Sequence, residues 1–161
     1  LNFYVINKSQ AQVTTTPPDG SVGTAKLDAN AVMPKYAKQG DAGMDLTATW
    51  MEFDHERKIV TYGTGLAFEI PFWHVGLIYP RSSVYKKSMV LSNHVGVIDS
   101  GYRGEIMFKY RVLNDDWQDI YDVGDRIGQI IITPYPKIEF EEVAELTPTE
   151  RGDGSYGSTG S

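Results

Sequence analysis

The sequence has no cysteine and no long apolar run. The absence of cysteine excludes disulfide bonds, zinc sites built on thiolates and cysteine nucleophiles, and it agrees with a reducing compartment. No run approaches the roughly 18 apolar residues that a membrane-spanning helix needs. The apolar segment at residues 1–6 is also too short for the core of a signal peptide. We therefore expect a protein of the cytoplasm or of the interior of a host cell that does not bind a membrane.

Positive charge is scarce as well. The chain has 15 Lys and Arg against 21 Asp and Glu, which gives a net charge of −6. This charge argues against non-specific binding to nucleic acid or to an anionic membrane surface. A phosphorylated ligand would have to bind at a local group of basic residues, with the help of a divalent cation.

The apolar residues that are present recur with a period of two. The 161 residues, of which 41% are hydrophobic, suffice for one domain with a core. Residues 66–70 and 105–112 alternate as half-buried strands do. Short β-branched runs at residues 75–79 and 130–133 each end at a proline. Many short strands punctuated by Gly and Pro predict an all-β sandwich, jelly roll or barrel.

Two other local features are predicted within this single domain. One short helix is expected at residues 82–88, with Ser82 or Ser83 as its N-cap. Residues 10–30 are polar and include TTTPPDG, so we expect a surface loop inserted in the domain. Such a loop could bind a protein partner, although inert surface is the more common role of a loop of this kind.

Four groups of polar residues lie between the predicted strands. Residues 41–46 (DAGMDL) place two carboxylates beside a glycine, and residues 80–83 (PRSS) place an Arg and two hydroxyls at a helix start, where an anion is stabilised. Residues 92–105 predict two strands joined by a turn that holds Asp99, and residues 124–129 (GDRIGQ) add an Arg and an amide. Taken singly, each group is a weak signal, because turn carboxylates and surface arginines are common.

The C-terminal residues 151–161 (RGDGSYGSTGS) contain almost no apolar side chain. Alone they should be mobile, because they cannot bury enough surface to offset the entropy of ordering. Yet a guanidinium fork, glycine N–H groups, hydroxyls and one aromatic ring are suited to clamp a nucleotide polyphosphate. Composition alone favours a disordered end.

In this order and at this spacing, the four groups and the C-terminal segment resemble the trimeric dUTPase family (deoxyuridine triphosphate nucleotidohydrolases). The resemblance includes GVIDSGYRGE at residues 96–105 and extends from about residue 31 to the end. It implies a distorted β jelly roll of the dUTPase type (β-clip-like), assembled as a homotrimer with active sites at the subunit interfaces. The implied reaction converts dUTP to dUMP and pyrophosphate with Mg²⁺. This reaction limits uracil incorporation into DNA and supplies dUMP for thymidylate synthesis.

The resemblance also implies roles for single residues. Asp99 would be the general base that holds the attacking water, and Mg²⁺ would travel on the phosphates with Asp45 as a water-mediated contact and no direct protein ligand. The implied phosphate donors are Ser82, Ser83 and Gln129, with Arg81 and Arg126 beside them. The implied base and sugar contacts are Asn93, Gly96, Val97, Ile98 and Tyr102. In the C-terminal segment the implied contacts are Arg151 on the γ-phosphate, Tyr156 stacked on uracil, and Gly154, Gly157, Ser158 and Thr159 around them.

The domain organisation follows from the same resemblance. Residues 1–150 would form one β domain that carries the first four motifs, and residues 151–161 would form a flexible lid over a neighbouring subunit's site. Two other functions remain open at this point. One is a dCTP deaminase of the same superfamily, which would need a site centred on a Glu that activates water. The other is a regulatory module that binds a protein partner through residues 10–30.

Overall fold

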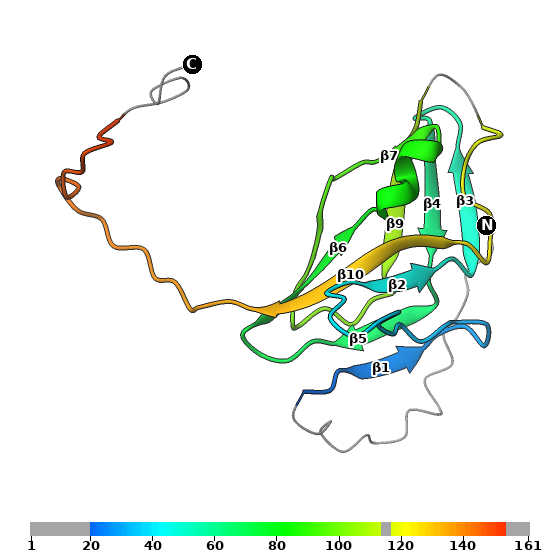
Figure 1. Cartoon of the computed structure of the whole chain (residues 1–161), viewed down its shortest axis with the longest axis horizontal. Coiled ribbons are helices and arrows are strands. Elements are labelled where there is room, and N and C mark those ends of the chain that lie inside the picture. The colour runs from blue at the N-terminus through cyan, green and yellow to red at the C-terminus, as the bar shows by residue number, and fades with distance from the viewer. Residues whose placement is uncertain (1–19, 114–116, 154–161) are drawn as a thin grey trace.

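The computed structural model describes residues 20–113 and 117–153. These residues form ten strands and one short 3₁₀ helix, so the expectation of an all-β protein with one short helix is confirmed (Figure 1). In chain order the elements are β1 (Gly23–Lys26), β2 (Met44–Thr47), β3 (Trp50–Asp54), β4 (Ile59–Gly63), β5 (Leu66–Glu69), β6 (His74–Tyr79), η2 (Ser82–Lys86), β7 (Met89–Leu91), β8 (Gly96–Ile98), β9 (Met107–Val112) and β10 (Arg126–Pro134).

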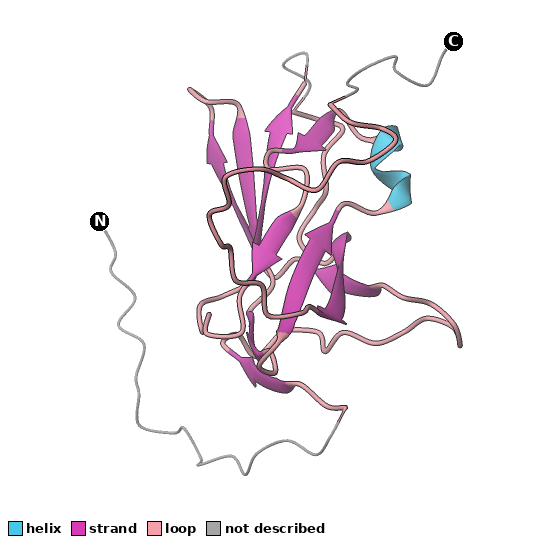
Figure 2. Cartoon of the chain, turned by 90° about the vertical axis from the view of Figure 1, so that its left-hand side faces the viewer, coloured by secondary structure: helices cyan, strands magenta, loops and turns pink. Residues whose placement is uncertain are grey.

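The strands form three antiparallel sheets. Their orders are β1-β5, β2-β10-β6-β8 and β3-β4-β9-β7, and Figure 2 shows the strands gathered around a common interior. Buried side chains from both four-stranded sheets, such as Ile130 of β10 and Phe108 of β9, belong to one hydrophobic cluster. The described residues include no helix long and apolar enough to cross a membrane.

The predicted alternation is confirmed in detail. Along β9 every second side chain is buried, from Phe108 to Tyr110 to Val112, and the side chains between them are exposed. In the segment that contains β5, Leu66, Phe68 and Ile70 are buried as predicted, but Ala67 between them is buried as well. The period of two thus identified the core face of β9, whereas β5 is buried on both faces over its first three residues.

Three local predictions were wrong. η2 begins after Arg81, which is the extended N-cap residue and makes no side-chain capping bond, so Ser82 and Ser83 lie inside the helix. Part of the segment predicted as loop forms β1, which pairs with β5, whereas residues 10–19 lie outside the described residues. Residues 92–105 contain only one strand, β8, instead of two strands joined by a turn; β8 pairs with β6, whereas the next strand, β9, pairs with β4 and β7 in a different sheet.

β10 contains a bulge that determines which of its side chains face the core. Arg126 lies opposite Thr47 of β2 and Gly128 lies opposite Leu46, so Ile127 is the extra residue. The side chain of Ile127 is fully buried. Its carbonyl accepts a hydrogen bond from the Tyr110 hydroxyl at 2.6 Å. The hydroxyl of a core tyrosine therefore supplies the hydrogen-bond donor that the Ile127 carbonyl at the bulge requires.

Three buried tyrosines pack edge to face in this part of the core. The ring centroids of Tyr62, Tyr110 and Tyr121 lie 5.8 to 6.2 Å apart. The Tyr62 hydroxyl donates to the Tyr121 carbonyl at 2.8 Å. Burial raises the pKa of both Tyr62 and Tyr110 above the ordinary value of 10.0. These two hydroxyls are therefore protonated donors that stabilise the core.

Tyr110→Phe should destabilise the protein by about 1–2 kcal/mol, because the buried Ile127 carbonyl loses its donor. Urea unfolding followed by tryptophan fluorescence measures the change. Tyr36→Phe, at a side chain that is 56% exposed, serves as the control and should leave the midpoint unchanged. Equal midpoints for Tyr110→Phe and the wild type would show that the bulge does not need this hydrogen bond.

The stability of the protein should fall as the pH rises above about 10. The pKa values of Tyr62 and Tyr110 are raised in the folded state, so above pH 10 the unfolded chain loses protons that the native state retains. Each tyrosine should contribute a loss of up to about 1.4 kcal/mol per pH unit. Urea midpoints between pH 9 and about 11 test this, and the Tyr62→Phe/Tyr110→Phe double variant should show a shallower decline.

Candidate functional site

One group of polar residues is built around the carboxylate of Asp45. Arg81 Nε donates to Asp45 Oδ1 at 2.8 Å and Arg81 Nη2 to Oδ2 at 3.4 Å. Arg126 Nη1 donates to the same Oδ2 at 3.1 Å. The Asp45 cluster comprises these residues with Ser83 and Gln129. It holds two guanidinium groups and one carboxylate, so one positive charge is in excess.

The sheet order explains why these residues meet. β10 lies between β2 and β6, and Gln129 of β10 is the register partner of both Asp45 and Tyr79. Arg81 follows the end of β6 by two residues, so it reaches the same edge. Because of the bulge at Ile127, Arg126 and Gln129 share one face of β10 although they are three residues apart.

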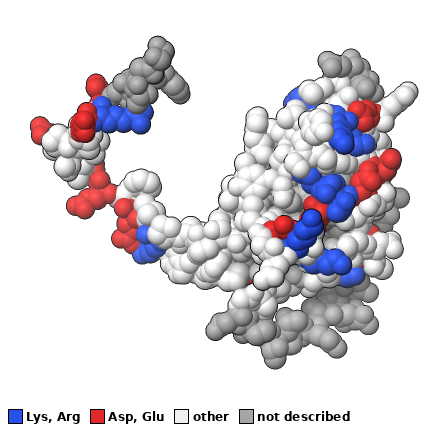
Figure 3. Space-filling model, viewed as in Figure 1, with Lys and Arg blue, Asp and Glu red and all other residues white. Residues whose placement is uncertain are grey.

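Two further hydrogen bonds complete the Asp45 cluster. Gln129 Nε2 donates to the Pro80 carbonyl at 3.1 Å, and Arg81 Nη1 donates to Ser83 Oγ at 3.3 Å. A Cβ atom at residue 43 would lie 2.2 Å from Gln129 Oε1, so Gly43 allows the Gln129 amide its present position against the backbone. Ser82, the other predicted phosphate donor, is exposed at the start of η2. Figure 3 shows several basic side chains of the body gathered on the face that β2 and β10 form.

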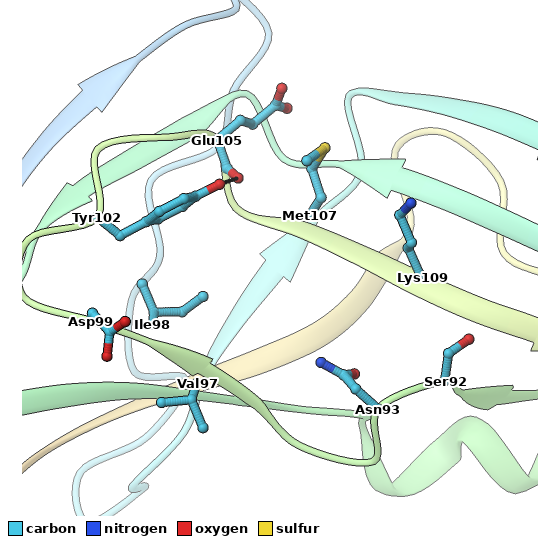
Figure 4. Close-up of a pocket in the computed structure, with 9 residues that line it drawn as sticks. All are labelled: Ser92, Asn93, Val97, Ile98, Asp99, Tyr102, Glu105, Met107 and Lys109. Carbon is cyan, nitrogen blue, oxygen red and sulfur yellow. Dashed lines mark hydrogen bonds between the residues drawn. The ribbon is translucent and has the colours of Figure 1, made fainter.

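A pocket of about 450 Å³ forms the second group. Figure 4 shows Tyr102 and Asp99 at one side of it and Asn93 and Lys109 at the other. The structure brings together five predicted residues, namely Asn93, Val97, Ile98, Asp99 and Tyr102, and adds Ser92, Glu105, Met107 and Lys109. We call this the Asp99 pocket. The predicted contact Gly96 instead packs against β6, where a Cβ would lie 2.3 Å from an Ile78 side-chain atom.

Turn contacts hold the Asp99 pocket in shape. The Tyr102 N–H donates to the Asp99 carbonyl at 3.0 Å, and the Tyr102 hydroxyl donates to the Glu105 carbonyl at 3.1 Å. The Tyr102 ring lies so close to Gly104 that a Cβ there would be 2.4 Å from the hydroxyl oxygen. The Glu105 carboxylate accepts from Trp50 Nε1 at 2.9 Å and from the Gly65 N–H at 2.8 Å. Glu105 therefore anchors the segment to the neighbouring sheet.

Met107 and Lys109 are pocket residues that the sequence reasoning did not select. Both are exposed members of the β9 alternation, and that pattern already separates them from the buried Phe108 and Tyr110. The alternation of β9 therefore already indicated that Met107 and Lys109 are exposed. It did not indicate that the exposed face of β9 forms one wall of the Asp99 pocket.

The last described residues of the chain are remote from both groups. Residues 135–153 run away from the body as an extended arm (Figure 1), and Arg151 lies near its end. The other predicted contacts, namely Gly154, Tyr156, Gly157, Ser158 and Thr159, lie outside the described residues. Within residues 20–113 and 117–153, no hydrogen bond or ion pair links the Asp45 cluster to the Asp99 pocket, and no group of three or more His, Asp or Glu is placed to hold a metal ion.

The chemistry of the two groups differs. The Asp45 cluster offers guanidinium, hydroxyl and amide donors, which suit phosphate oxygens. The Asp99 pocket offers a carboxylate beside an aromatic ring and an amide, which suits a nucleoside and a proton transfer. Together they could bind a nucleotide and activate a water.

Comparison with known proteins agrees with this description. The family model described as dUTPase matches residues 29–160. A deoxyuridine 5′-triphosphate nucleotidohydrolase of Corynebacterium glutamicum is 41% identical over 143 residues, which cover 87% of this chain and 95% of that protein. The protein of the same name from Rhodococcus erythropolis is 40% identical and covers 87% of this chain and 86% of that protein.

Solved structures show the same likeness. The dUTPase of Staphylococcus bacteriophage 80alpha with dUpNHpp aligns with a TM-score of 0.76 at 26% identity, over 88% of this chain and 99% of that chain. A mutant dUTPase of the Staphylococcus aureus phage phi11, described with a structural Mg(II) ion, aligns with a TM-score of 0.67 at 24% identity over 78% of this chain and 98% of that chain. The extent of the family match and the identity to curated relatives show that this chain belongs to the dUTPase family.

Proposed function

We propose that this protein hydrolyses dUTP to dUMP and pyrophosphate in the cytoplasm or in the interior of a host cell. The observation that carries the proposal is the Asp99 pocket, which unites Asn93, Asp99 and Tyr102 in a chain of the dUTPase family. Curated relatives at about 40% identity are named deoxyuridine 5′-triphosphate nucleotidohydrolases, and a related phage enzyme was solved with dUpNHpp.

Asp99 would act as the general base. A water held by its carboxylate attacks the α-phosphorus, a P–O bond to the water oxygen forms, and the α–β bridging bond breaks. Pyrophosphate leaves, and Asp99 takes the proton of the water. Because the nucleophile is water, the chain needs no covalent intermediate, and the work of the site is positioning and charge stabilisation.

The Asp99 pocket would select the base and the sugar. The backbone of β8, with Asn93, would pair with the edge of uracil, and a close fit would leave no room for the methyl group of thymine. The Tyr102 ring, fixed by its bond to Glu105 and its contact with Gly104, would lie against the deoxyribose and exclude a 2′-hydroxyl.

The Asp45 cluster would bind the phosphates through Ser83 and Gln129, together with the neighbouring Ser82, and Arg81 and Arg126 would supply positive charge. The residues present fit a Mg²⁺ that is bound mainly by the substrate. A carboxylate has about four acceptor sites, and three arginine hydrogen bonds occupy Asp45, so one site remains for a metal-bound water. When bound, Mg²⁺ would neutralise charge on the triphosphate.

The active enzyme would be a homotrimer in which different chains complete each site. The arm exposes apolar side chains that a single chain leaves in solvent, notably Phe140 at 99% and Leu146 at 86%. With the exposed Ile138 and Val143 they make an apolar series along the arm, and exposed apolar surface of this extent marks an interaction site. Residues 151–161 would then close over a neighbouring chain's nucleotide as a lid.

Asp99→Asn should lower kcat for dUTP by about 10²- to 10⁴-fold, because the water loses its proton acceptor. The measurement is pyrophosphate release from dUTP, dTTP, dCTP and UTP, of which only dUTP should be converted well by the wild type. Asp54→Asn, at the last residue of β3, serves as a matched carboxylate control and should retain full activity. Comparable hydrolysis of dTTP, ammonia release from dCTP, or a fast Asp99→Asn enzyme would each contradict the assignment.

Two changes in the arm should separate assembly from closure. Deletion of residues 151–161 should leave a trimer that binds dUTP weakly and converts it slowly, because the lid is lost. Phe140→Asp should weaken the trimer, because a charge would have to be buried in the interface. Sedimentation velocity and steady-state kinetics measure both. Full activity after the deletion would refute the lid, and an unaltered trimer with Phe140→Asp would place that side chain outside the interface.

A further inference from the structure

Tyr121 carries a buried hydroxyl that the fold does not use. Its side chain is 4% exposed. Among the residues that the structure describes, its hydroxyl is the one buried side-chain polar atom that has no hydrogen-bond partner. An unpaired buried hydroxyl destabilises a folded protein, so a group of this kind requires an explanation.

The two tyrosines packed against Tyr121 show that the core can satisfy such a hydroxyl. Tyr62 donates to the Tyr121 carbonyl at 2.8 Å, and Tyr110 donates to the Ile127 carbonyl at 2.6 Å. All three rings pack edge to face in the same cluster. A phenylalanine at residue 121 would fill the same space without the unpaired oxygen.

Tyr121 adjoins two segments that supply arginines or serines to the Asp45 cluster. On one side is the end of η2, where Lys87 Nζ lies 5.6 Å from the Tyr121 ring centroid and donates to the Ile120 carbonyl at 2.8 Å. On the other side is the turn that leads to Arg126, closed by a bond from the Asp122 N–H to Asp125 Oδ2 at 2.9 Å. The position of the Tyr121 ring is therefore coupled to both segments.

The groups around the Tyr121 hydroxyl belong to the same site. Burial raises the pKa of Tyr121, the Ser83 hydroxyl and the positive charge of Arg81 lower it, and the negative charge of Asp125 raises it. Ser83 is thus near enough to act on the Tyr121 hydroxyl, although that hydroxyl has no partner at ordinary hydrogen-bond geometry.

Ser83 can accept one more hydrogen bond. A serine oxygen has two acceptor lone pairs and one proton, and one lone pair already accepts from Arg81 Nη1 at the long distance of 3.3 Å. If a second donor bound the other lone pair, both acceptor positions of Ser83 Oγ would be filled. Only the Ser83 hydroxyl proton would then be free to make a further hydrogen bond. That proton could then be donated to a ligand oxygen.

We propose that Tyr121 is a positioning residue of the phosphate site: when the nucleotide binds, its buried hydroxyl donates to Ser83 Oγ and thereby directs the Ser83 proton to a phosphate oxygen. This inference rests on the proposed hydrolysis of dUTP. A tyrosine suits the role because its ring is packed against Tyr62, Tyr110 and Lys87, so its hydroxyl is held in one place.

The test compares Tyr121→Phe with Tyr62→Phe, each alone and combined with Ser83→Ala. Tyr121→Phe should retain or raise the melting temperature, because it removes an unpaired group, and should lower kcat/KM for dUTP about 3- to 10-fold. In the Ser83→Ala background Tyr121→Phe should have no further effect, since the two hydroxyls act as one unit. Tyr62→Phe should lower the melting temperature, and its effect on kcat/KM should be the same in both backgrounds.

Binding measurements separate the phosphate from the nucleoside. By calorimetry Tyr121→Phe should weaken binding of dUpNHpp and leave binding of 2′-deoxyuridine, which has no phosphate, unchanged. A lowered melting temperature with unchanged kinetics would make Tyr121 a purely structural residue and overturn the proposal. An equal loss of kcat/KM with and without Ser83→Ala would also overturn it. If the wild type does not hydrolyse dUTP, the proposed function is wrong. If Tyr121→Phe binds dUpNHpp as tightly as the wild type does, the positioning role of Tyr121 is wrong, whatever the outcome for dUTP hydrolysis.

Discussion

The bulge at Ile127 is the constraint on which both the core and the Asp45 cluster depend. In a regular strand, Arg126 and Gln129 would point to opposite faces, because side chains alternate. The extra residue brings both to the face of Asp45, while Ile127 itself enters the core. At the bulge the Ile127 carbonyl accepts a hydrogen bond from the buried Tyr110 hydroxyl. One irregularity thus links a core hydrogen bond to a surface ion pair.

The charges of the Asp45 cluster explain how an acidic chain can attract a polyanion. The net charge of the protein is −6, but Arg81 and Arg126 converge on one carboxylate and leave one positive charge in excess. Without Asp45 the two guanidinium groups would repel each other. The carboxylate therefore holds them together and fixes the direction of each, so their remaining N–H groups stay available to phosphate oxygens.

The segment from Asn93 to Glu105 crosses from one sheet to the other, and this crossing creates the Asp99 pocket. A hairpin and a crossing have the same local signature, namely two short strands with a polar turn between them. Strand pairing decides between them: β8 pairs with β6, whereas β9 pairs with β4 and β7. The sequence therefore predicted Asp99, Tyr102 and Asn93 as neighbours, but it did not reveal that Met107 and Lys109 complete the wall.

By itself, the sequence determined the strands β5, β6, β9 and β10 and the buried face of β9, because the apolar patterns that specify them are local. Its motifs also indicated the family, together with Asp45, Arg81, Asp99 and Arg126. It misplaced the helix cap and missed β1, whose four residues GTAK carry no clear alternation. Only the tertiary structure decided the bulge, the unpaired hydroxyl of Tyr121 beside Ser83, and the meeting of Arg126 with a carboxylate 81 residues away. The physical reason is that such contacts depend on which strands pair across the sheet, and residues distant in the sequence settle that choice.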